Sequence, residues 1–110
     1  MKATITYIQL KSPLKFFALS SYALKIMKQF KTSNIIEFKK RGFWIKHYTM
    51  SLWKNEQDMK SFAMNGAHLE AMKKSRLIAK EIRIHTIDAD KLPDWKTAIS
   101  LLEKARVYKY

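Results

Sequence analysis

His68 and Asn65 offer the chemistry of a general base and of a hydrogen-bond donor, close to the point where a helix restarts. A neutral imidazole titrates near pH 6.5, so His68 could accept a proton or ligate iron. The Asn65 amide could donate a hydrogen bond to a bound substrate. The alternative for His68 is a helix-start histidine that bonds only to backbone or solvent. We take His68 and Asn65 as the catalytic candidates.

Aromatic side chains surround the longest expected strand, residues 43–53, and could form a slot for a flat hydrophobic substrate. The set comprises Trp44, Trp53, Phe43, Tyr48, Tyr7 and Phe62. The substrate-binding candidates among them are Trp44, Tyr48, Tyr7 and Phe62. The alternative is that these rings only pack in the core and in a dimer interface.

Arg83 and His85 are two residues apart in the expected strand 81–88, so they share one of its faces. They could line an anion-attracting cavity, which makes them further substrate-binding candidates, or they could stand at a solvated rim. His47 lies in the middle of a strand, and we expect its role to be structural.

Several kinds of chemistry find no support in the sequence. With no cysteine there is no disulfide, zinc ribbon or thiol nucleophile. No His, Asp or Glu cluster has metal-ligand spacing, so no metal site is expected. No Ser-His-Asp elbow, paired glycosidase carboxylates or glycine-rich phosphate loop is present. Nothing in the sequence specifies hydrolysis.

The net charge of +13 is the extreme feature of the composition, and it would attract phosphate, anionic lipid or an acidic partner. Lysines dominate and are scattered along the chain, whereas nucleic-acid readers favour arginine. The only arginines are Arg41, Arg76, Arg83 and Arg106. A solvated surface is therefore the expectation, a polyanion site is the alternative, and no nucleic-acid partner is expected.

Hydrophobic periodicity predicts an alternation of strands and helices. Strands are expected at 3–10, 35–40, 43–53 and 81–88, with a turn at Arg41-Gly42. Helices are expected from 14 to about 30, from an Asn55 cap to a break at Asn65-Gly66, over 67–79, and from Pro93 onward. This order matches a ferredoxin-like βαββαβ α+β fold with strand order 4-1-3-2 and a C-terminal helix. We expect residues 1–110 to form one domain.

The expected strands are apolar on both faces, which a sheet with one wet face would not be. Residues 43–53 place Trp44, Tyr48, Met50 and Leu52 on one face and Phe43, Ile45 and Trp53 on the other. The main helices can cover only one face, and the last helix is too short to cover the other alone. We therefore expect a homodimer in which a second copy packs against this sheet.

The stretch Gly42–Phe62, GFWIKHYTMSLWKNEQDMKSF, resembles the centre of the dimeric α+β barrel superfamily. That superfamily includes antibiotic-biosynthesis monooxygenases, haem-degrading monooxygenases and spheroidene-monooxygenase-like proteins. The shared pattern is a strand ending in Ser-x-Trp-x-Asn, a small-residue break, and a His-bearing helix, here residues 66–72. The short spheroidene-monooxygenase-like members look most similar, since they also have a closing helix with a buried Trp, like Pro93-Asp94-Trp95.

The resemblance implies a monooxygenase-like protein that acts on a small hydrophobic or aromatic ligand inside a barrel cavity. Two positions depart from the haem-degrading members, because Phe62 stands where they have Trp and Met72 where they have the haem-ligating His. The expected cofactor is therefore none, or haem. Whether the protein is an enzyme stays open. The alternatives are a non-catalytic dimeric ligand-binding or interaction module and a polyanion binder.

No apolar run approaches the ~20 residues of a membrane helix, and the first residues lack a signal-peptide core. We expect a cytoplasmic protein without a membrane partner.

Overall fold

A five-stranded antiparallel sheet forms the centre of the computed structural model, which describes residues 1–110. The strands are β1 (Lys2–Leu10), β2 (Ile35–Phe43), β3 (Lys46–Trp53), β4 (Ala79–Asp88) and β5 (Arg106–Lys109). Their order across the sheet is β2-β3-β1-β4-β5. The first four strands have the expected 4-1-3-2 arrangement, so the ferredoxin-like α+β fold is confirmed.

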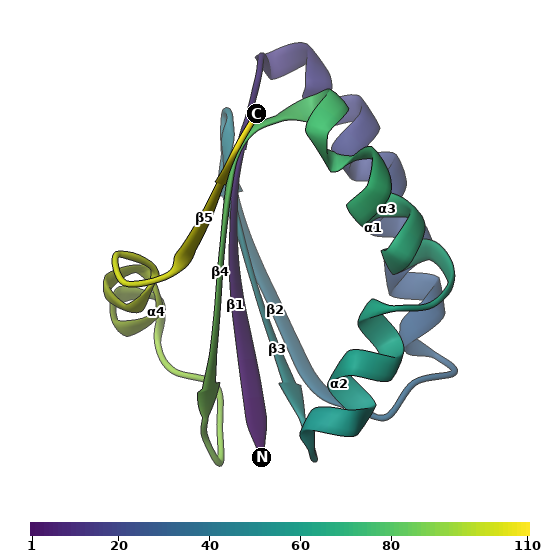
Figure 1. The fold of residues 1–110 in the computed structure, drawn as a ribbon, viewed down its shortest axis with the longest axis vertical. Helices are drawn as coiled ribbons and strands as arrows, with labels where there is room; N and C mark the ends of the chain where they lie inside the picture. The colour runs from purple at the N-terminus through teal and green to yellow at the C-terminus, as the bar shows by residue number, and fades with distance from the viewer.

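The helices lie on both sides of this sheet. They are a short 3-10 helix η1 (Pro13–Lys15), then α1 (Phe16–Phe30), α2 (Glu56–Ala63), α3 (Gly66–Ile78) and α4 (Trp95–Leu102). Figure 1 shows α1, α2 and α3 on one side and α4 alone on the other. We call the two sides of the sheet the helix face and the α4 face. No helix is both long and apolar enough to span a membrane.

The main core lies on the α4 face. Alternation along β1 buries Ala3, Ile5 and Tyr7 on this side, opposite Met50 and Leu52 of β3. Leu92, Ala98 and Leu102 cover them from α4 and the segment before it. The last helix therefore covers one part of the face for which a second copy was expected.

A cluster of aromatic rings joins the helices to the helix face. Phe62 of α2 has its ring centroid 5.0 Å from that of Trp53 and 5.0 Å from that of Phe30 in α1. Phe30 in turn contacts Phe38 of β2, with centroids 4.8 Å apart. These rings fix α2 over the end of β3.

Local capping sets the helix starts near the candidate site. Asn55 accepts a hydrogen bond from the Asp58 backbone N–H at 2.8 Å, which caps α2 as expected. The break between α2 and α3 is confirmed, and Gly66 there has φ +56°, a left-handed conformation that favours glycine. Asp94 caps α4 by accepting from the Thr97 backbone N–H at 2.7 Å.

Four sequence expectations were wrong in detail. The hairpin turn lies at Trp44-Ile45, not at Arg41-Gly42, and the left-handed residue is Trp44 with φ 58°. Gly42 lies in β2, paired with His47 of β3. The His47 ring lies over it, and an added Cβ would come within 2.1 Å of Nδ1. Pro93 precedes the α4 cap instead of opening the helix, and β5 was not anticipated. The segment 13–15 forms η1 before α1.

Candidate functional site

The structure divides the predicted site residues between the two faces of the sheet. Phe62, Asn65 and His68 lie at the junction of α2 and α3, on the helix side. The α4 face carries Tyr7, Tyr48, Arg83 and His85, because β1 pairs Tyr7 with both Tyr48 and Arg83 and pairs Ile5 with His85. One protomer therefore offers two separate candidate sites, and Trp44 belongs to neither.

His68 is held by its ring and its backbone in the first turn of α3. Its Nδ1 lies 3.1 Å from the Ala63 carbonyl, which can only accept, so Nδ1 carries the proton. The Nε2 atom then has a free lone pair. Every fully buried polar side-chain atom in the structure has a hydrogen-bond partner. Because Nε2 has no such partner, it is not fully buried.

Burial lowers the pKa of His68 from its usual 6.5, and the hydrogen bond to the Ala63 carbonyl offsets part of this effect. The ring packs against Phe62 with centroids 5.3 Å apart. Because the pKa lies below 6.5, His68 is neutral at pH 7. The junction thus holds an imidazole in the form that can accept a proton or bind a metal.

Gln29 of α1 holds the junction together, and no pattern in the sequence singled it out. Its Nε2 donates to the Asn65 carbonyl at 2.9 Å and to the Phe62 carbonyl at 3.2 Å. Its Oε1 accepts from the His68 backbone N–H at 2.9 Å. The added Cβ of any residue at Gly66 would lie 3.2 Å from the Gln29 amide carbon. Gln29 is therefore a positioning residue for His68.

Asn65 uses its side-chain amide within the fold. Its Nδ2 donates to the Ser61 carbonyl at 2.6 Å, which closes the last turn of α2. A donor that is already engaged cannot bind a substrate without giving up this bond. The structure thus brings Asn65 close to His68 but occupies its donor.

Hydroxyl side chains form a contiguous patch on the helix face. Strand pairing aligns Thr4 with Ser51 and Thr86, and aligns Thr6 with Thr49. We call Thr4, Thr6, Thr49, Ser51 and Thr86 the hydroxyl patch. All five are at least partly exposed, although helices lie over this face. Water therefore reaches the central strands between the two layers.

The aromatic cluster connects the hydroxyl patch to His68. The indole Nε1 of Trp53 donates to the Ser51 hydroxyl at 2.9 Å. The Trp53 ring contacts Phe62, and Phe62 contacts His68. The two rings thus form a continuous apolar surface that runs from Ser51 of the hydroxyl patch to the imidazole of His68.

The second group, on the α4 face, is an aromatic and ionic cluster. The Tyr7 and Tyr48 ring centroids are 5.0 Å apart, and Tyr48 meets Trp95 of α4 at 6.5 Å. Arg83 pairs with Glu81 at 3.0 Å. Burial first, and then the neighbouring Tyr48 and Glu81, raise the pKa of Tyr7. Tyr7 is therefore a protonated hydrogen-bond donor at pH 7, and its hydroxyl donates to Gln9 at 3.2 Å.

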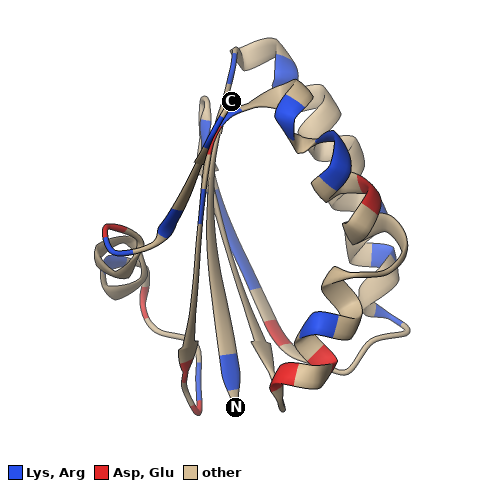
Figure 2. Ribbon diagram, viewed as in Figure 1, with Lys and Arg blue, Asp and Glu red and all other residues tan.

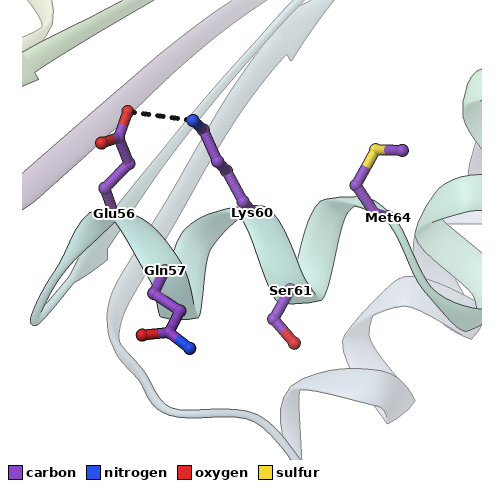
Figure 3. Close-up of a pocket in the computed structure, with 5 residues that line it drawn as sticks. All are labelled: Glu56, Gln57, Lys60, Ser61 and Met64. Atoms are coloured by element: carbon purple, nitrogen blue, oxygen red, sulfur yellow. Dashed lines mark ion pairs between the residues drawn. The ribbon is translucent and has the colours of Figure 1, made fainter.

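Two depressions flank α2, and both are open to solvent. One, of about 510 Å³, is lined by Glu56, Gln57, Lys60, Ser61 and Met64. Figure 3 shows Glu56 and Lys60 directed toward each other, 3.4 Å apart, with Gln57 and Ser61 on the other side of the helix. The other, of about 320 Å³, includes Gln29, Phe62 and Asn65 in its lining. The residues of the first depression come only from α2 and its C-cap residue Met64, so a single helix forms it.

No group of three or more His, Cys, Asp or Glu side chains is placed to hold a metal ion. The only imidazole at the junction is His68, and its neighbours there are a carbonyl, an amide and rings.

Comparison with known proteins gave similarity only at the level of structure. No model of a protein family matches the chain, and no curated protein matches its sequence. An antibiotic biosynthesis monooxygenase of solved structure superposes with a TM-score of 0.70 at 10% identity, over 84% of this chain and 100% of that one.

Two further solved structures show the same similarity. A conserved protein from Methanosarcina mazei Go1 has a TM-score of 0.72 at 13% identity, covering 81% of this chain and 92% of that chain. A protein of unknown function from Nitrosomonas europaea has a TM-score of 0.69 at 14% identity, covering 84% and 94%. The fold is thus shared with antibiotic biosynthesis monooxygenase-like proteins, as the sequence resemblance implied. Identities this low establish the fold and leave the activity to the site.

Proposed function

We propose that the protein is a cofactor-independent monooxygenase that oxidises a small hydroxylated aromatic compound between the sheet and helices α2 and α3. The observation that carries the proposal is His68, whose protonated Nδ1 is fixed by Ala63 and whose Nε2 has no hydrogen-bond partner and is not fully buried. The shared fold with an antibiotic biosynthesis monooxygenase supports the same reaction class.

The chemistry requires a base and no prosthetic group. The His68 Nε2 atom accepts the proton of a phenolic hydroxyl, and the phenolate transfers one electron to O2. The two radicals combine by a carbon–oxygen bond at an electron-rich ring carbon, and His68 returns the proton to give a hydroperoxide. Cleavage of the O–O bond with loss of the ring hydrogen releases water and leaves a quinone. One O2 thus supplies one quinone oxygen and one water.

Two surfaces between the sheet and the helices would recognise the substrate. The Trp53 and Phe62 rings offer an apolar wall for a flat ring, and the hydroxyl patch offers donors and acceptors to ring oxygens. Thr4, Thr86 and Ser51 already have hydrogen-bond partners in the fold. A purely apolar substrate would cover the Thr6 and Thr49 hydroxyl groups without offering them partners, which is costly. This narrows the expected small hydrophobic or aromatic ligand to a hydroxylated aromatic one.

The residues at the junction do not fit haem, the other cofactor that the sequence left open. The His68 Nε2 atom could ligate iron, but a site for a group as large as a tetrapyrrole is lined mainly by apolar side chains. The sheet facing α2 and α3 carries the five hydroxyl groups of the patch instead. Phe62 and Gln29 occupy the space beside the imidazole.

The proposed activity is tested by O2 consumption with anthrone and 1-naphthol as probes, in chelator-treated protein. The His68→Asn variant is the sharpest comparison, because an asparagine amide can replace Nδ1–H on the Ala63 carbonyl but offers no base. We expect one O2 consumed per quinone formed, and a loss of about 100-fold or more in rate for His68→Asn. The Thr6→Val variant should raise KM. The Thr32→Val variant, in the depression of about 320 Å³ beside α2, should leave both kcat and KM unchanged.

Equal rates for the wild type and His68→Asn would refute the base, and absence of O2 consumption with every probe would refute the activity. Saturable binding of a probe without turnover would favour the alternative, a ligand-binding module. The Tyr7–Tyr48–Trp95 cluster on the α4 face is the feature that favours this alternative.

A further inference from the structure

Exposed aromatic side chains gather at one end of the molecule. Leu14 and Phe17, at the start of the first helical segment, are 76% and 75% exposed, and Phe43 and Trp44, at the β2–β3 turn, are 84% and 66% exposed. Single exposed apolar residues are common, but four large ones at one end are not.

Contacts between segments bring these residues together. The Leu10 backbone N–H donates to the Ile45 carbonyl at 2.8 Å, which places the β2–β3 turn beside the end of β1. The Phe16 ring stacks on His47 with centroids 5.5 Å apart, so the start of α1 lies over the same hairpin. The Lys11 N–H bonds to the Ile78 carbonyl, which adds the end of α3 and its exposed Leu77. We call residues 10–17, 41–47 and 76–80, with the C-terminal 109–110, the aromatic end.

The charge of the aromatic end has one sign. This end contains no Asp or Glu, and its Lys and Arg side chains are all exposed: Lys11, Lys15, Arg41, Lys46, Arg76, Lys80 and Lys109. Glu81, which follows Lys80 in the chain, forms an ion pair with Arg83. Figure 2 shows several acidic segments near the N-terminus, at the opposite end of the sheet, where strand pairing places Asp88 beside Lys2. The net charge of +13 is therefore concentrated where the aromatic side chains are.

From this combination we infer that the aromatic end docks on the surface of an anionic lipid bilayer. Aromatic side chains enter the interface between headgroups and acyl chains, and lysines around them bind anionic headgroups. Trp44 stands at the tip of the hairpin with φ 58°, a conformation that bulky residues rarely adopt, so its side chain is presented there at a cost. Binding to the surface of a bilayer does not require a membrane-spanning helix. The inference does not rest on the proposed activity.

Like charge disfavours a second copy as the occupant, and the exposed leucines disfavour nucleic acid. A twofold contact through this end would place lysines of one protomer against the same lysines of the other. Nucleic acid gains from stacking on aromatic rings, but it gains little from exposed leucines, whereas acyl chains accept both. The aliphatic Leu14 and Leu77 therefore favour lipid.

Co-sedimentation with vesicles tests the inference. We expect binding to phosphatidylcholine vesicles with about 30% phosphatidylserine, and little binding to phosphatidylcholine alone. The double variant Phe43→Ser/Trp44→Asn should bind at least about tenfold more weakly, because the interfacial side chains are gone. Asparagine tolerates a left-handed conformation, so this variant should fold.

Two matched controls separate the end from the rest of the surface. Leu24→Ser removes an exposed leucine from the middle of α1, and Lys54→Glu reverses a charge at the other end. Both should bind phosphatidylserine vesicles as tightly as the wild type does. The double variant Lys11→Glu/Lys15→Glu should bind them more weakly, because it reverses two charges of the aromatic end.

Equal binding by the Phe43→Ser/Trp44→Asn variant and the wild type would overturn the inference, as would no binding to phosphatidylserine vesicles. A single-stranded oligonucleotide that binds the aromatic end more tightly than the vesicles do would also overturn it. A blue shift of the fluorescence on vesicle addition, absent in Trp44→Phe, would support it.

Discussion

The ionisation of His68 links the site to the stability of the fold. Its pKa is lowered in the folded state by burial, so the protonated form favours the unfolded chain. The contribution of neutral His68 to stability is therefore present above its unfolded pKa of 6.5 and is lost as pH falls through the folded value.

We expect the wild type to lose more free energy of unfolding than His68→Asn between about pH 7.5 and pH 5.5. Both proteins keep His47 and His85, so the difference between their urea curves isolates His68. Parallel pH dependences of the two proteins would show that His68 has its ordinary pKa in the fold.

Gln29 is the residue on which the α2–α3 junction depends. The Gln29→Leu variant keeps the size of the side chain but leaves the His68 N–H without its acceptor. It also removes one of the donors to the Phe62 and Asn65 carbonyls, which keep their backbone hydrogen bonds. We expect a loss of about 1–3 kcal/mol in the free energy of unfolding. The control Gln57→Leu, on the exposed side of α2, should change it by less than about 0.5 kcal/mol. Similar losses for both variants would contradict the role of Gln29.

At the scale of elements, local signals were predictable and long-range ones were not. The Asn55 cap and the Gly66 break depend on a few neighbouring residues, and both were found from the sequence. Gly42 misled because the sequence contains only two glycines, and the position of the His47 ring over it depends on strand pairing. The strand β5 has four residues, all exposed, so it has no apolar alternation to detect.

Apart from Gln29, the residues of the candidate site were predictable from the sequence, but their arrangement was not, because it depends on long-range strand pairing. The types of residue were evident, but the faces on which they lie depend on β1 register. With apolar residues on both faces of the strands, the sequence could not tell which face the three helices would cover. Tyr7 and His68 therefore seemed available to one pocket, whereas the sheet separates them. Gln29 gave no signal, because its partners are backbone groups far along the chain.

The helix α4 stabilises the sheet by covering the α4 face. Leu102 is 3% exposed and belongs to the main core, whereas Ile99 on the same helix is 37% exposed. We expect Leu102→Ala to lower the free energy of unfolding by about 2–5 kcal/mol. Ile99→Ala should lower it by less than about 1.5 kcal/mol. Equal effects in urea denaturation would mean that α4 does not pack as described.

At the scale of the whole molecule, the homodimer stays a prediction. The helix α4 covers the part of its face around Ala3 and Ile5, and the remainder around Tyr48 and Val107 is free for a partner. This remainder carries both signs of charge, with Glu81 beside Arg83 and Glu37 beside Lys39. Mixed charge allows a twofold contact, which the single sign of the aromatic end does not.

Sedimentation velocity is expected to give twice the protomer mass of 13.0 kDa at micromolar concentrations. Val107→Asp, on the α4 face, should shift the protein toward the protomer, while Leu24→Asp on α1 should not. A wild-type protein that sediments with the mass of one protomer would contradict the predicted dimer. It would not affect the His68 site, since one chain supplies all of the residues of that site.

The claim at the centre of this account is that His68 presents a neutral imidazole with a free Nε2. A long-range ¹H–¹⁵N spectrum of histidine-labelled protein measures the tautomer and the pKa together, with His68→Asn giving the assignment. We predict a protonated Nδ1, an unprotonated Nε2, and a titration midpoint below the usual 6.5. A protonated Nε2 at neutral pH, or a midpoint at or above that value, would contradict the account.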